Sequence, residues 1–192
     1  ARGLWGYTGE TGTGRRLTVQ STGIGGPAAV AVIDGLAELG VKRIVRLGTC
    51  VGTARPSERG TPAAPGEAFL VTRAVAGDGA TAALTDGSQA TLPDPGLNAS
   101  LESIAPPSPV FSHDLLPHLA ETPAQTDRAP VRDLQTAATF AIAARHGLAA
   151  AAILVVAEPG PDDRLSVAVL DSVFSPLATE VAQALGREGS NS

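Results

Sequence analysis

The sequence of 192 residues contains few of the residues that mark several large classes of protein. Its single cysteine, Cys50, excludes an intramolecular disulfide and fits a reducing compartment, so the cytoplasm is the expected location. Lys42 is the only lysine, and basic residues do not cluster along the chain. Because a nucleic-acid backbone is bound through a basic surface, and the net charge is −5, we expect no nucleic-acid partner.

Long hydrophobic runs are also missing from the chain. No stretch approaches the length that spans a bilayer, and no signal peptide opens the sequence, so we expect no membrane association. The chain begins at Ala1 rather than at a methionine, which suggests a fragment or a trimmed numbering.

Aromatic residues make up only 3% of the chain, whereas hydrophobic residues as a group make up 43%. Alanine, valine, leucine and glycine dominate, and the mean hydropathy is +0.13. This composition argues against extended disorder and predicts a core of small aliphatic side chains. The expected fold is α/β, a single domain over residues 1–192 with a mixed, mostly parallel sheet flanked by helices.

Hydrophobic patterning predicts strands that alternate with helices. Strands are expected at residues 17–20, 43–47, 68–72, 110–112 and 151–157, and helices at 28–39, 98–104, 134–146 and 175–185. The first strand, helix and second strand form a crossover unit, which implies that the two strands are parallel. Residues 76–109 are rich in Gly, Pro and small polar residues and are expected to form a long surface excursion.

A glycine loop, Thr22-Gly23-Ile24-Gly25-Gly26, joins the first predicted strand to the first helix. Glycines let the backbone approach an anion, and a helix start points N–H groups at it, but a tight structural turn is an equally good interpretation. A dinucleotide site also needs an acidic residue at the end of the next strand. Arg46 and Thr49 stand there instead, so a nicotinamide-dependent oxidoreductase is disfavoured.

Arg46 lies inside an apolar strand, where a charge is costly to bury unless an anion or a carboxylate meets it. Its planar guanidinium suits phosphate, and Thr49 together with the glycines at 48 and 52 would add further donors. A structural ion pair with an Asp or Glu is the other interpretation. These residues alone leave both open.

Several motifs occur in the order and spacing of one known family. Ser21–Pro27, Leu36–Gly40 and Arg46–Thr49, followed downstream by Pro65–Thr72, Phe111–Leu116 and Asp133–Ala138, resemble the uridine and purine nucleoside phosphorylases. The resemblance covers nearly the whole chain. It implies phosphorolytic cleavage of a nucleoside's N-glycosidic bond to free base and ribose 1-phosphate. Inorganic phosphate would be the co-substrate, with no metal and no other cofactor, in a homo-oligomer built from dimers, up to a hexamer.

The resemblance also assigns roles to individual residues. Phosphate would be held by Gly25, Arg46 and Thr49, with Arg2 lent by a neighbouring subunit; ribose by Leu134, Gln135 and Thr49; and the base by Leu116, Cys50 and Glu158. The catalytic pair would be Arg46, which holds phosphate near C1′, and Glu158, which protonates the leaving base. The three histidines, at 113, 118 and 146, are scattered and predict no metal site, and His146 is expected to cap a helix C-terminus.

Four departures from the family pattern keep alternatives open. Gln135 replaces a glutamate, Leu116 replaces a phenylalanine, Glu158 replaces an aspartate, and the family's N-terminal strand and phosphate loop are absent from this chain. Purine is favoured over uridine because Glu158 occupies the position of the purine acid and residues 120–122 lack the arginine of uridine enzymes. The alternatives are a hydrolytic nucleosidase of the same fold and a catalytically degenerate nucleoside-binding protein.

Overall fold

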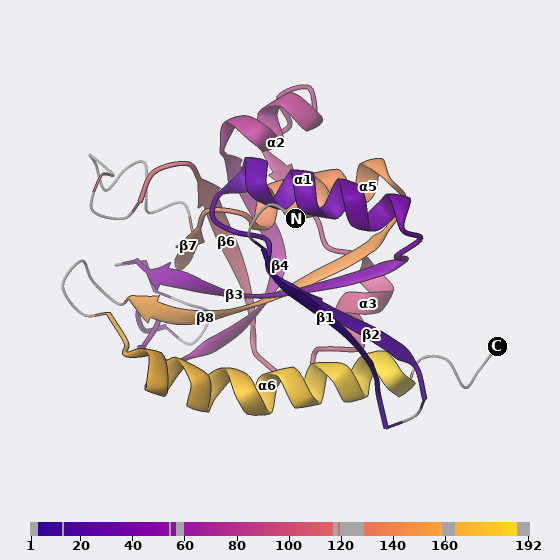
Figure 1. Cartoon of the computed structure of the whole chain (residues 1–192). Coiled ribbons are helices and arrows are strands. Elements are labelled where there is room, and N and C mark those ends of the chain that lie inside the picture. The colour runs from indigo at the N-terminus through magenta and orange to yellow at the C-terminus, as the bar shows by residue number, and fades with distance from the viewer. Residues whose placement is uncertain are drawn as a thin grey trace.

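The fold was analysed in a computed structural model of the whole chain (Figure 1). The structure describes residues 4–12, 14–53, 55–56, 60–116, 119, 129–158 and 164–187. Among these residues, no helix is both long and apolar enough to cross a membrane.

Six strands form the main sheet: β3 Arg43–Gly52, β4 Ala68–Gly77, β5 Ala90–Thr91, β6 Pro107–His113, β7 Val131–Asp133 and β8 Ala149–Glu158. Their order is β5-β4-β6-β7-β3-β8, and β8 also pairs with β4, so the sheet closes on itself like a barrel. Among the described strands, β3–β8, β4–β6 and β6–β7 are parallel, whereas β3–β7, β4–β5 and β4–β8 are antiparallel. The α/β class is confirmed, but the mostly parallel sheet is not, because β3–β7, β4–β5 and β4–β8 pair antiparallel.

Helices cover the sheet on two sides: α1 Gly26–Glu38, α2 Gly79–Leu84 and α5 Thr136–Arg145 on one side, and α3 Pro95–Ala99 and α6 Val167–Arg187 on the other. Figure 1 shows α1 and α5 side by side above β3 and β8, with α6 beneath them. The predicted helices 28–39, 134–146 and 175–185 are confirmed in place. However, α6 begins well before residue 175, and Pro176 lies inside it.

Strand β8 forms the centre of the core, as its continuous apolar run predicts. Ala152, Leu154 and Val156 face the α1 and α5 side, whereas Ala151 and Ile153 face the α3 and α6 side. All five are fully buried. A strand with apolar residues on both faces is expected between two helical layers, and its alanines let the helices approach closely.

The N-terminal strands differ from the predicted crossover. β1 Gly6–Glu10 and β2 Arg16–Gln20 pair antiparallel as a separate hairpin. Consequently β2 is not a strand of the main sheet, and the expected parallel pairing between β2 and β3 is wrong. The physical reason is that β1 supplies the hydrogen-bonding partner of β2, although its residues include two glycines and no apolar run.

Residues 76–109 are not a surface excursion. They contain α2, β5 and α3, and Leu97 and Leu101 are 3% and 0% exposed. Two of the polar residues that made this segment resemble a loop are helix caps. Asp78 accepts a hydrogen bond from the Thr81 N–H at 2.7 Å, and Asp94 accepts one from the Leu97 N–H at 2.8 Å.

Candidate active site

Arg46 on β3 forms an ion pair with Asp133, the last residue of β7. Arg46 Nη2 lies 3.1 Å from Asp133 Oδ2, and the two side chains are 12% and 0% exposed. The same carboxylate accepts hydrogen bonds from Ser112 Oγ at 2.6 Å and from Thr136 through its N–H at 3.0 Å and its Oγ1 at 2.6 Å. The structural ion pair, one of the two interpretations of Arg46, is therefore present.

The ion pair leaves much of the guanidinium unused. Arg46 Nε and Nη1 are buried and have no hydrogen-bond partner among the described residues. Unpaired buried donors of this kind cost free energy, which a ligand oxyanion at the same place would remove. The guanidinium lies across Gly48, and a Cβ at that position would overlap Nη1. Gly48 thus makes room for Arg46, and the anion interpretation remains compatible with the ion pair.

Gln135, at the start of α5, joins this ion pair to the glycine loop. Its side-chain Nε2 donates to the Gly23 carbonyl at 2.7 Å and to the Gly25 carbonyl at 3.3 Å. Asp133 and Gln135 are two residues apart, so their Cα atoms are separated by at most about 7 Å. Therefore the structure brings Arg46, Gln135 and Gly25 into one neighbourhood.

The loop itself requires glycine at more than one position. Gly23 and Gly25 have φ values of 75° and 85°, in the region that favours glycine. Gly26 is buried at the start of α1, and a Cβ there would lie 3.1 Å from that of Ala80 and 3.2 Å from that of Ala138. Pro27 occupies the first turn of α1, where no backbone N–H is needed.

Cys50 is a correction to the predicted base site. The residue is 3% exposed and belongs to the core cluster under α1 and α5. Burial raises the pKa of its thiol, the Asp133 carboxylate raises it further, and only Arg46 lowers it. The base of a nucleoside cannot contact this buried side chain in the structure, so Cys50 has a packing role.

Thr49 and Leu116 of the predicted site are exposed, whereas Leu134 is half-buried. Thr49 is exposed, and strand alternation places it with Val45 and Leu47 on the face opposite Arg46. Leu116 is 42% exposed in the segment after β6. Leu134 is half-buried between Asp133 and Gln135, next to the ion pair.

Glu158 ends β8, where it lies beside Val51 in the parallel register with β3. Its side chain is 23% exposed and its Oε1 lies 3.3 Å from Nε of Arg164, which is itself 77% exposed. Glu158 is thus at the C-terminal end of β8 and accessible from solvent, whereas Arg46 pairs with Ala152 nearer the start of the two strands. Two further residues, Arg2 and His118, lie outside the described part of the chain.

Sequence analysis gave no role to Asp133 or His113. His113 is 7% exposed and its ring stacks on Phe111, with centroids 5.5 Å apart. Burial lowers its pKa, the Arg132 charge lowers it further, and Asp133 and Asp114 oppose both effects. His146 does occupy the C-cap of α5, as expected, and its Nε2 lies 2.9 Å from Oδ1 of Asp34. In the part of the chain that the structure describes, no group of three or more His, Cys, Asp and Glu residues could hold a metal ion.

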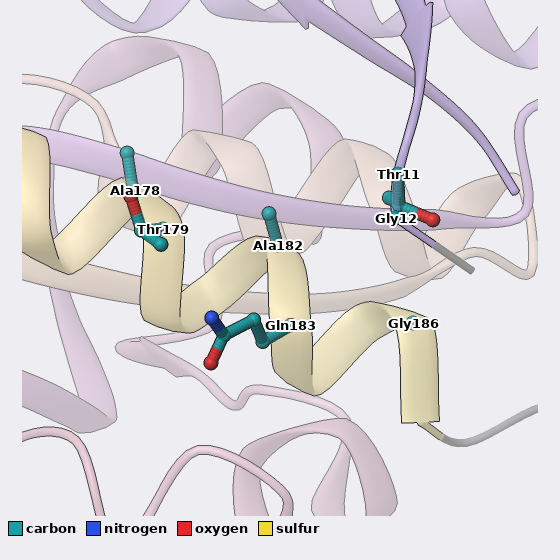
Figure 2. Close-up of a pocket in the computed structure, with 7 residues that line it drawn as sticks. All are labelled: Thr11, Gly12, Ala178, Thr179, Ala182, Gln183 and Gly186. Atoms are coloured by element: carbon teal, nitrogen blue, oxygen red, sulfur yellow. The ribbon is translucent and has the colours of Figure 1, made fainter. Parts of the chain in front are cut away.

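A groove of about 650 Å³ lies away from the site. It runs between the turn of the N-terminal hairpin and α6, as Figure 2 shows. Its walls are mostly small residues: Thr11, Gly12, Ala178, Thr179, Ala182, Gln183 and Gly186. None of the predicted site residues contributes to it, so the groove supports no part of the catalytic interpretation.

Two solved structures share this architecture. Purine nucleoside phosphorylase from Toxoplasma gondii, in complex with immucillin-H, superposes with a TM-score of 0.76 at 20% identity, over 91% of this chain and 76% of that one. AMP nucleosidase from Bacteroides thetaiotaomicron VPI-5482 gives a TM-score of 0.72 at 17% identity, over 94% of this chain and 76% of that one. This chain has the fold of the nucleoside phosphorylases and nucleosidases.

Sequence comparison gives a shorter match in the same direction. A DeoD-type purine nucleoside phosphorylase from Alkaliphilus metalliredigens (strain QYMF) is 42% identical over 50 residues. The match spans 26% of this chain and 21% of that protein. No protein-family model matches the sequence. The nucleoside phosphorylase fold therefore rests on the structural similarity, and the short sequence match agrees with it.

Proposed function

We propose that the protein is a nucleoside phosphorylase that cleaves a purine nucleoside to free base and ribose 1-phosphate. The observation that carries this proposal is the buried guanidinium of Arg46. One of its nitrogens is fixed by Asp133, whereas Nε and Nη1 have no partner within the described residues. A phosphate oxygen is a suitable acceptor for these donors, because guanidinium N–H groups bind phosphate in a planar, directional way.

Each proposed role follows the charge that develops during the reaction. Breaking the glycosidic bond builds positive charge on the ribose and negative charge on the departing base. Phosphate held by Arg46 and the glycine loop would stabilise the ribose cation and attack C1′. Glu158 lies at the solvent-accessible end of β8. In its protonated form, Glu158 would donate a proton to the departing base. Asp133 would hold the guanidinium in orientation, and Leu134 would contact the ribose.

Hydrolysis is the second candidate, and one observation favours it. The Asp133 carboxylate balances the charge of Arg46 at 3.1 Å, which weakens the attraction of the site for a phosphate anion. An AMP nucleosidase is also among the similar structures. A nucleosidase would use water where a phosphorylase uses phosphate, and the two can be separated by the phosphate requirement alone.

A catalytically degenerate nucleoside-binding protein is the third candidate. The amide of Gln135 is committed to the glycine loop, so it is not free to hold the ribose in the way that the sequence resemblance implies. Such a protein would bind nucleoside without releasing base.

The test is incubation of the protein with inosine, adenosine and uridine, with and without phosphate, followed by chromatography for free base. The proposal predicts that hypoxanthine and adenine are released only with phosphate and that ribose 1-phosphate forms in equal amount. Equal release without phosphate would favour hydrolysis. Nucleoside binding in calorimetry without any release would favour the degenerate binder.

The proposal needs no metal or other cofactor and includes assembly into a homo-oligomer. Light scattering tests the assembly, and a monomer at all accessible concentrations would contradict it. Arg2, at the proposed interface, is the residue to vary in that experiment.

A further inference from the structure

We propose that Gln135 is a positioning residue, which holds the glycine loop of residues 22–26 closed and turns the Ile24 N–H of that loop outward. The proposal rests on the proposed function only for the identity of the anion that this N–H group would meet. The positioning itself rests on contacts within the protein.

Within the described residues, every hydrogen bond of the Gln135 side chain is with the loop. Its Nε2 donates to the carbonyls of Gly23 and Gly25, and its Oε1 accepts from Thr22 Oγ1 at 3.3 Å. The residue is 6% exposed, so little water is available to replace these hydrogen bonds. Both N–H donors of the amide are therefore used, and one side chain is hydrogen-bonded to Thr22, Gly23 and Gly25.

Peptide planarity carries this orientation from the carbonyls to the N–H groups. In a trans peptide unit the C=O of one residue and the N–H of the next point in opposite directions. The described chain contains no cis peptide bond. Because the carbonyls of Gly23 and Gly25 point at Gln135, the N–H groups of Ile24 and Gly26 point away from it.

Of these two N–H groups, that of Ile24 remains available to a ligand, whereas Gly26 is buried. No hydrogen bond within the described residues uses the N–H of Ile24 or Gly26. Ile24 is 79% exposed, and Gly26 is the first residue of α1, where a helix leaves its N–H groups unpaired. An exposed N–H group beside the start of a helix is a donor for an oxyanion. Gln135 would set the orientation of the Ile24 N–H without contacting the anion.

The amide suits this position better than a carboxylate. A glutamate in place of Gln135 would put an ionised oxygen against the carbonyl oxygens of Gly23 and Gly25, and these oxygens repel each other. Protonated, it would donate only one hydrogen bond in place of two. The variant Gln135→Glu should therefore release the loop at neutral pH and partly restore it as the pH falls and the carboxyl takes up a proton.

Charged groups around Gln135 set the background for such a pH profile. They are Arg46 on β3, Asp133 at the end of β7, and Asp78 at the start of α2. Oδ1 of Asp78 lies against Gly26. His113 is the last residue of β6, and Asp114 follows it. Since all five groups are present in the wild type and in the variant, the effect of Gln135→Glu is the difference between the two pH profiles.

The experiment measures the backbone carbonyl ¹³C resonances of Gly23 and Gly25 by NMR between pH 5 and pH 8 without any ligand. Gln183→Glu is the matched control, because it makes the same chemical change on the exposed face of α6. In Gln135→Glu both resonances should move upfield at pH 8, as carbonyls do when they lose a donor, and at least one should return towards its wild-type position at pH 5. The wild type and Gln183→Glu should show neither change. Unchanged carbonyl resonances in Gln135→Glu at pH 8, or a pH-independent loss of the whole spectrum, would overturn the proposal.

A second arm reads the outward Ile24 N–H with inorganic sulfate, which does not titrate in this pH range. In the wild type, sulfate should shift the amide resonance of Ile24. In Gln135→Glu at pH 8, sulfate should bind more weakly by about tenfold or more, the loss expected when a charge-assisted hydrogen bond is removed. Equal sulfate affinity in both proteins would contradict the outward orientation. Failure of the proposed function would appear differently, as absence of base release by a wild type whose carbonyl resonances still report a closed loop.

Discussion

Arg46 is the residue on which the account depends, and Asp133 satisfies only part of its guanidinium. Its charge meets Asp133, a fully buried carboxylate that also accepts hydrogen bonds from Ser112 and Thr136. Its remaining buried N–H groups have no partner in the described structure. The ion pair offsets the free-energy cost of burying the charge, and the unpaired N–H groups are donors for a ligand.

Arg46→Ala should therefore affect stability as well as activity. Removing one partner of a buried ion pair costs about 3–5 kcal/mol, because the other charge stays buried. Here the hydrogen bonds from Ser112 and Thr136 remain and place the effect at the lower end of that range. Urea unfolding measures it. A free energy of unfolding equal to that of the wild type would show that Asp133 does not need Arg46.

Gly48→Ala should disturb the same pair without removing a charge. A Cβ at Gly48 would overlap Nη1 of Arg46, so the guanidinium must move away from Asp133. We expect a loss of about 1–3 kcal/mol in the free energy of unfolding, typical of an overpacked site, together with loss of phosphate-dependent base release. Gly87→Ala is not a suitable control because its φ is 83°, whereas Gly9→Ala places its methyl in open space. Wild-type behaviour of Gly48→Ala would mean that the guanidinium does not lie across residue 48.

The buried Cys50 thiol should be unreactive in the folded protein. Burial raises its pKa well above the value of 9.0 that an exposed thiol has. It therefore stays protonated when folded, whereas an unfolded chain loses this proton near pH 9.0. The contribution to stability is present below pH 9.0 and is lost as the pH rises above it. A colorimetric thiol reagent at pH 8 should react with Cys50 only after urea is added, and rapid reaction of the native protein would contradict its burial.

At the scale of elements, the sequence predicts best where the pattern is local and strong. The apolar runs of β3 and β8 and the periodicity of α1 and α5 identify these elements to within a few residues. β7 is only three residues long, from Val131 to Asp133, and too short to carry a pattern. Its pairing with the distant strand β3 is what brings Asp133 to Arg46, and no local feature of the sequence encodes that pairing. This is why sequence analysis found Arg46 but left its partner open.

In segment 76–109 the sequence predicts a loop where the structure has helices and a strand. Its Asp, Gly and Pro residues resemble a loop, yet Asp94 caps α3 and Pro95 begins it. Asp94→Ala should cost about 1 kcal/mol in the free energy of unfolding, as loss of a helix N-cap does, and should leave base release unchanged because α3 lies on the far side of the sheet from Arg46. Thermal unfolding followed by circular dichroism measures this cost. An unchanged melting temperature would contradict the helix cap and favour the surface excursion predicted from the sequence.

On the scale of the whole molecule, the sheet is closed and mixed rather than open and mostly parallel. The strand order places β7 between β6 and β3, and the 133–135 segment then links the Arg46 ion pair to the glycine loop before α1. Residues that are widely separated in the sequence thus converge on one edge of the sheet. The resemblance in the sequence predicted their convergence, whereas composition and periodicity alone did not.

The central claim is that the guanidinium of Arg46 binds phosphate while it remains paired with Asp133. Arg46→Lys tests it most directly, because lysine keeps the positive charge for Asp133 but lacks the planar fork of N–H groups. The decisive measurement is the KM for phosphate in base release from inosine, for the wild type and for Arg46→Lys, with urea unfolding to verify the fold. The account predicts a KM for phosphate raised about tenfold or more at nearly unchanged stability, the loss of one charge-assisted hydrogen bond. An unchanged KM for phosphate, or base release that needs no phosphate in either protein, would contradict it.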